Sequence, residues 1–137
     1  MKTTISLLFA AIGLVLVFGF QQNRWTDSTK IETGMFKVTV LYPAGEGKTF
    51  DWNYYSGKHV PMVKSLLGDS VKLISVDKGI AGRTAGSPAP YLAMFHMYFK
   101  SIAAYQNSFG PNAEKIRKDI PNYTNIQPVV QISEVQQ

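Results

Sequence analysis

The segment from Tyr91 to Phe99 restricts the fold of this chain more than any other part of it. Apart from His96, each of its residues is apolar or aromatic. Successive residues of a strand point to opposite faces of the sheet, so a strand of this composition is typically covered on both faces. We therefore expect a sheet in which neither face is left in water at this strand.

Three other segments of the sequence predict the remaining strands of the sheet. Apolar residues alternate from Phe36 to Tyr42, which is the period of a strand, and folded structure should begin near Met35. Residues 71–77 form a second, less regular strand, and residues 128–135 form the last one. Between 71–77 and the apolar segment lies a Gly-, Pro- and Ser-rich loop, 79–90.

Capping residues locate two helices between these strands. Asp51 is placed to accept from the first free amides of a helix that reaches Leu67, with Gly68 as its C-cap. Ser101 is placed to cap a second helix, which Gly110 and Pro111 interrupt.

The resulting order is βαββαβ, which predicts an α+β, ferredoxin-like fold: an antiparallel four-stranded sheet with both helices on one face. Such a sheet leaves its other face open. Because an exposed apolar patch of that size is a liability, we expect a second copy of the chain to cover it.

Pro61 predicts an irregularity within the first helix. A proline inside a helix removes the hydrogen bond to the residue four positions earlier, here Gly57, at a cost of roughly 3 kcal/mol. We therefore expect a kink or a restart near Lys58, beside His59.

The N-terminal residues form a separate region. Lys2 precedes an apolar run from Ile5 to Phe20, the layout of a secretory signal peptide. As a helix this run spans roughly 24 Å, short of a hydrocarbon core of roughly 30 Å, which favours a signal peptide over a membrane segment. The predicted organisation is a signal peptide or N-terminal membrane segment at 1–20, a linker at 21–34 and one domain at 35–137. The domain is then exported, periplasmic or secreted, or membrane-anchored if the segment is uncleaved.

Composition excludes several classes of site. The chain has no cysteine, so disulfides, thiol catalysis and thiolate metal sites are excluded. Its net charge is +5, but the basic residues are scattered, which argues against nucleic acid as a partner. The two histidines lie far apart without a supporting acid at ligand spacing, so we expect no metal, and no cofactor-binding motif is present.

His59 is the residue on which function most depends. On a helix that begins at Asp51, it shares a stripe with aromatic and apolar residues: Trp52, Tyr55, Met62, Val63 and Leu66. An imidazole with an unperturbed pKa of about 6.5 is a natural proton shuttle near neutral pH. The alternative is a core histidine bonded to a backbone carbonyl, and the residues alone leave both open.

Four segments resemble the EthD family, named for a protein of ethyl tert-butyl ether degradation. They are VLYPAGEGKTFDWNYYSGKHVPM, VDKGIAG, PAPYLAMFHMYF and DIPNYTNIQPVVQISEV. The resemblance as a whole spans roughly Met35 to Val135. The resemblance implies a dimeric α+β barrel, and it places the motif acid at Asp51, the motif tyrosines at Tyr54 and Tyr55, and the motif histidine at His59. Fungal relatives are associated with decarboxylation or dehydration of aromatic polyketides. The N-terminal apolar segment departs from the family, because its members are often cytoplasmic.

Together these observations favour a homodimer whose apolar pocket takes a small hydrophobic or aromatic molecule. His59 is predicted as a general acid–base, with Tyr55 donating to a substrate oxygen, in cofactor-independent isomerase, dehydratase or decarboxylase chemistry. The predicted substrate-binding residues are Asp51, Tyr54, His96, Asn122 and Tyr123. For His96 the alternative is a packing histidine. Two other functions stay open: a non-catalytic binding or accessory protein of an oxidative degradation pathway, and a structural dimerisation module.

Overall fold

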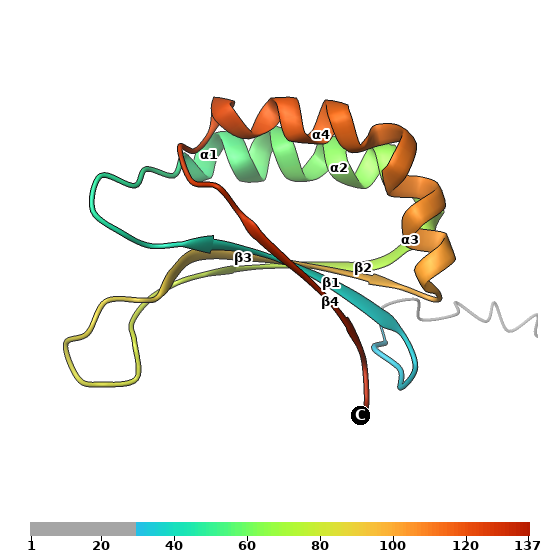
Figure 1. The fold of residues 1–137 in the computed structure, drawn as a ribbon, viewed down its shortest axis with the longest axis horizontal. Coiled ribbons are helices and arrows are strands. Elements are labelled where there is room, and N and C mark those ends of the chain that lie inside the picture. Colours follow the sequence, from blue (N-terminus) through green and yellow to red (C-terminus); the bar gives the residue numbers. More distant parts are fainter. Residues whose placement is uncertain (1–29) are drawn as a thin grey trace, which may run out of the picture.

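The computed structural model describes residues 30–137 and confirms the α+β, ferredoxin-like fold. The strands are β1 (Phe36–Pro43), β2 (Val71–Lys78), β3 (Tyr91–Phe99) and β4 (Val129–Glu134). They form one sheet in the order β2-β3-β1-β4, with every neighbouring pair antiparallel. Figure 1 shows the helices gathered on one side of this sheet, as the predicted order requires.

The first helical region is continuous but not uniform. It consists of α1 (Trp52–Tyr54), a π-helical segment (Tyr55–His59) and α2 (Val60–Leu67). In the π-helical segment the Val60 N–H donates to the Tyr55 carbonyl five residues earlier. The irregularity predicted from Pro61 is therefore a widened turn that ends at His59.

Side-chain caps begin both helical regions where the sequence predicts them. One carboxylate oxygen of Asp51 accepts from the Asn53 and Tyr54 amides at 3.0 Å each. The Ser101 hydroxyl accepts from the Ala104 amide at 3.1 Å and opens α3 (Ile102–Phe109). After the Gly-Pro interruption the chain continues as α4 (Ala113–Asp119), followed by a short 3₁₀ turn (Ile120–Asn122).

The core lies between the sheet and the helices, in two parts. One part, mostly aliphatic, contains Val38, Val63, Leu67, Phe95, Met97, Phe99 and Ile116. The other, mostly aromatic, lies toward the start of the first helical region and contains Tyr42, Tyr55, Ala93, Tyr123 and Ile126. His59 is 3% exposed and borders the aromatic part, so the first helix brings the histidine inside the molecule.

The opposite face of the sheet carries no helix (Figure 1). Leu41 pairs with Met94 and Val129 there, and Tyr98 pairs with Lys37 and Leu73. Val129 is 52% exposed. In the single chain, this face therefore presents apolar side chains to solvent.

The predicted N-terminal segment at 1–20 lies outside the described residues, as does the linker except for 30–34. Within the part that is described, no helix combines the length and apolar composition needed to cross a membrane. Near the start of this part, the Gly34 N–H donates to the Val135 carbonyl at 2.8 Å, which joins this end of the domain to the residues after β4.

Candidate functional site

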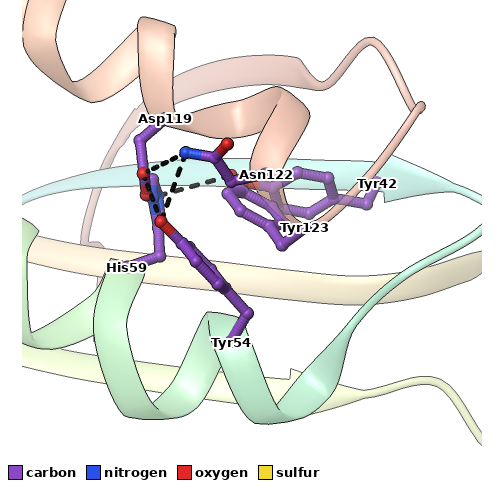
Figure 2. A network of polar contacts seen from close by, with 6 residues as sticks. All are labelled: Tyr42, Tyr54, His59, Asp119, Asn122 and Tyr123. Atoms are coloured by element: carbon purple, nitrogen blue, oxygen red, sulfur yellow. Dashed lines mark hydrogen bonds and ion pairs between the residues drawn. The ribbon is translucent and has the colours of Figure 1, made fainter.

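His59 meets a carboxylate that is 60 residues away in sequence. Its Nδ1 lies 2.8 Å from Oδ2 of Asp119, the last residue of α4 (Figure 2). The side chains of His59 and Asp119 are 4% and 15% exposed, so this contact is shielded from solvent. Because a carboxylate only accepts, Nδ1 carries the proton and donates it to Asp119.

Two further donors hold the other oxygen of the same carboxylate. Oδ1 of Asp119 accepts from the Tyr54 hydroxyl at 2.7 Å and from the Asn122 side-chain amide at 2.8 Å. Burial raises the pKa of Asp119, but the hydrogen bonds from His59, Asn122 and Tyr54 outweigh it, so the net shift is downward. Asp119 is therefore ionised near neutral pH and fixed in orientation on both oxygens.

The other ring nitrogen of His59 faces a tyrosine pair. Nε2 lies 3.3 Å from the Tyr123 hydroxyl, which in turn lies 2.8 Å from the Tyr42 hydroxyl. With the proton on Nδ1, Nε2 is an acceptor, so Tyr123 donates to it and Tyr42 donates to Tyr123. Figure 2 shows these groups converging from β1, the first helical region and the segment after α4.

Burial sets the protonation of this chain of groups. It lowers the pKa of His59, and the hydrogen bond and negative charge of Asp119 offset that effect only in part. Burial also raises the pKa of Tyr123, and the neighbouring Tyr42 adds to the rise. Near neutral pH the site thus holds a neutral imidazole, whose Nε2 lone pair accepts from Tyr123, and a tyrosine that keeps its proton.

A cavity of about 290 Å³ lies beside this chain of groups, between the sheet and the helices. Ligand pockets span roughly 300–1,000 Å³, so its size suits a small molecule of one or two rings. The side chains around it are mostly apolar. The lining residues are Val40, Tyr42, His59, Val63, Phe95, Met97, Tyr105, Phe109, Ile116, Arg117, Ile120, Tyr123, Gln127, Pro128 and Val130.

Comparison with known proteins assigns the family. Residues 44–127 match the model of the EthD domain, a stretch that includes His59, Asp119 and Tyr123. The chain belongs to the EthD family. A relative from Rhodococcus erythropolis, an uncharacterized 11.0 kDa protein in the thcB-thcC intergenic region, is 32% identical over 94 residues, covering 66% of this chain and 85% of the relative.

Two crystal structures of EthD proteins are similar to this one. An EthD-like protein from Ralstonia eutropha JMP134 is 42% identical with a TM-score of 0.71, covering 75% of this chain and 93% of that one. An EthD family protein from Bacillus halodurans C-125 is 19% identical with a TM-score of 0.52, covering 73% of this chain and 97% of that one, a likeness of fold alone.

In this EthD domain, five of the seven predicted site residues occupy three kinds of position. His59 and Tyr123 line the cavity, and Tyr54 and Asn122 lie behind them, where both donate to Asp119. Asp51 caps the first helix and lines a separate, open surface hollow. The structure therefore brings four of the predicted residues into one network and leaves Asp51 outside it.

Tyr55 is fully buried and does not line the cavity. Its ring stacks on the His59 ring, with centroids 5.3 Å apart and planes 17° from parallel. Its hydroxyl has no hydrogen-bond partner among residues 30–137. In this position Tyr55 supports the imidazole from behind, and the hydroxyl that bonds to His59 Nε2 belongs to Tyr123.

His96 lies on the helix-free face of the sheet, away from the cavity. Its Nδ1 is 3.0 Å from the Thr39 hydroxyl and its Nε2 is 3.0 Å from Asp77. The two histidines of the EthD domain therefore belong to different sites. No group of three or more His, Asp or Glu side chains within residues 30–137 is arranged to hold a metal ion.

Asp119 is the site residue that sequence reasoning missed. It stands in the DIPNYTNIQP segment that carries the EthD resemblance, yet no role follows from its spacing to His59. One local signal points to it. An acid in the last turn of a helix lies near the negative end of the helix dipole, a locally unfavourable place that suggests a tertiary partner.

Proposed function

We propose that this EthD protein binds a small apolar molecule bearing a carbonyl or phenol group, and that His59 transfers a proton on it without a cofactor. The observation that carries the proposal is the state of His59. It lines an apolar cavity, its Nδ1 is held by an ionised carboxylate, and its Nε2 is unprotonated, with a lone pair that accepts only the long 3.3 Å contact from Tyr123. A neutral imidazole oriented in this way is a general base near neutral pH.

The proposed step is abstraction of a proton next to a carbonyl. The C–H bond breaks as Nε2 of His59 takes the proton, and the electron pair moves to the carbonyl oxygen to form an enolate. Tyr123 donates its O–H to that oxygen. Its 3.3 Å contact with Nε2 is longer than an ordinary hydrogen bond, so a substrate oxygen can replace it at little cost.

The atom to which His59 returns the proton decides which reaction follows. Delivery to a different atom gives an isomerisation, whereas loss of hydroxide from the neighbouring carbon, protonated by the imidazolium, gives a dehydration. In a decarboxylation the C–C bond to the carboxylate breaks instead, CO₂ leaves, and the electron pair moves to the carbonyl oxygen. His59, after taking up a proton from solvent, then protonates the carbon as a general acid. Isomerisation and dehydration use His59 first as a base, and all three reactions use the same oxygen-binding hydroxyl.

Deuterium exchange tests the proton transfer without knowledge of the natural substrate. We expect the protein to accelerate exchange of the α-protons of 2-tetralone in D₂O, followed by proton NMR. The His59→Gln variant should lose roughly 10²–10⁴-fold of the acceleration. Asp119→Asn should lose part of the acceleration, because the neutral side chain of asparagine holds the His59 ring less firmly than the carboxylate of Asp119 does. Full acceleration by folded His59→Gln contradicts the proposal.

A non-catalytic carrier is the second candidate, and the apolar character of the cavity wall supports it. Binding of a ligand in such a cavity does not require a titrating group. A carrier should bind 2-tetralone with equal affinity in the wild type and in His59→Gln, with no exchange above the buffer rate in either. Failure of the wild type to bind any probe of this size favours a structural module.

We also propose that the protein is a homodimer in which the helix-free faces of two sheets meet. The apolar side chains that Leu41, Met94 and Val129 present on that face support this.

A further inference from the structure

We propose that Arg117 makes the cavity select ligands that carry a carboxylate. This inference rests on the proposed function, because it concerns the substrate class of the same cavity. Arg117 is the one permanently charged side chain among the cavity-lining residues. It is also exposed, whereas His59 in the same lining is 3% exposed. Arg117 therefore stands at the solvent side of the cavity, and His59 at its interior.

The acids nearest to Arg117 along α4 are already engaged. Glu114 pairs with Lys118 at 2.7 Å, and Asp119 accepts from His59, Tyr54 and Asn122. None of the ion pairs within residues 30–137 includes Arg117. A guanidinium with no carboxylate of its own beside an apolar cavity is ready to bind the carboxylate of a ligand, and its planar fork suits that group.

Gln127 supports the same assignment. It lines the cavity and is exposed, so an amide that can donate stands with Arg117 on the solvent side. The lining away from these two residues and from the His59 and tyrosine group is aliphatic or aromatic. The ligand that matches this distribution has a carboxylate at one end, an apolar ring or chain in the middle, and a carbonyl or phenol at the His59 end.

A matched pair of probes tests the inference. 2-Naphthoic acid and 2-acetylnaphthalene have nearly the same shape, but only the acid is charged at pH 7. We expect isothermal titration calorimetry to show that the wild type binds the acid more tightly than the ketone. Arg117→Gln should weaken binding of the acid roughly tenfold and leave the affinity for the ketone unchanged.

Lys115→Gln is the matched control, because it removes the same charge from an exposed position of α4 that lies outside the cavity lining and outside the ion pairs of residues 30–137. If Lys115→Gln weakens binding of the acid as much as Arg117→Gln does, the effect is one of net charge and the inference is overturned. Equal affinity of the wild type for both probes overturns it as well but leaves the proposed function standing. If the wild type binds neither probe, the proposed function fails and this inference fails with it.

Discussion

The two tyrosines that flank His59 have opposite roles at the scale of single residues. The Tyr123 hydroxyl is bonded to the imidazole and to Tyr42, whereas the Tyr55 ring stacks on the imidazole with an unpartnered hydroxyl. A buried hydroxyl without a partner costs free energy that an apolar group of the same shape does not. We therefore expect the Tyr123 hydroxyl to contribute to both stability and function, and the Tyr55 hydroxyl to contribute to neither.

Tyr55→Phe should leave the stability of the protein unchanged or raise it, by up to about 1 kcal/mol, because it removes an unsatisfied polar group. Tyr123→Phe should lower the free energy of unfolding by about 1 kcal/mol, since it removes two hydrogen bonds. Urea denaturation measures both. Exchange of 2-tetralone should continue in Tyr55→Phe and slow in Tyr123→Phe, and a loss of exchange in folded Tyr55→Phe would return the substrate-donor role to Tyr55.

The lowered pKa of His59 gives stability a pH dependence of known sign. In the unfolded chain this imidazole takes up a proton near its ordinary pKa of about 6.5, whereas in the folded protein it does so only at lower pH. Between these two values the unfolded state binds more protons, so stability should rise with pH across that window. The lowered pKa of Asp119 adds a further loss of stability at more acidic pH, below its ordinary value.

Thermal unfolding measured from pH 2 to pH 8 in wild type and His59→Gln checks this expectation. The variant should lose the part of the pH dependence that lies just below 6.5 and keep the loss at more acidic pH. An identical profile in both proteins would mean that His59 does not titrate differently on folding.

At the scale of single elements, the first helical region has two glycines in different surroundings. Gly57 lies within the region, where another residue would fit, and Gly68 ends it in a conformation that favours glycine. Gly57 lies in the π-helical segment, is exposed, and has open space where a Cβ would stand. Gly68 ends α2 with φ 53° and ψ −142°, a conformation available almost only to glycine.

Gly57→Ala should therefore raise the free energy of unfolding by about 0.5–1 kcal/mol, because alanine loses less backbone entropy in a helix. Gly68→Ala should lower it by about 1–3 kcal/mol, because alanine strains the turn. Chemical denaturation of the two variants measures the contrast. If Gly57→Ala is instead destabilised, the π-helical segment requires glycine at position 57.

The elements were predictable from the sequence because their signals are local. Alternation located β1, and capping side chains located the two helical regions, with Asp51 and Ser101 at their starts. Pro61 indicated an irregular turn, but its π form was not predictable, since periodicity alone is read as an α-helix. The pairing of His59 with Asp119 was not predictable either, because it depends on how α4 lies against the first helical region and has no spacing rule.

At the scale of the whole molecule, the helix-free face of the sheet carries the test of the proposed homodimer. Leu41→Lys places a charge on the inner strand β1, between Met94 and Val129 of that face, where water solvates it in a monomer and a second sheet would bury it. Light scattering coupled to gel filtration should give a dimer for the wild type and a monomer for Leu41→Lys. Ser65→Lys, at an exposed position of α2, is the control and should stay dimeric. A monomeric wild type contradicts the proposal.

The contacts that build the site join distant parts of the chain. His59 and Asp119 are 60 residues apart, Tyr54 and Asp119 are 65 apart, and Tyr42 and Tyr123 are 81 apart. To form a contact of such long range, the chain must first lose the entropy of closing a long loop, and only then does the contact stabilise it. Such contacts therefore slow folding. We therefore expect the region around His59 to form late, after the helices and the β2–β3 pair. Ligand binding during refolding would then report the completed fold, and not a collapsed intermediate.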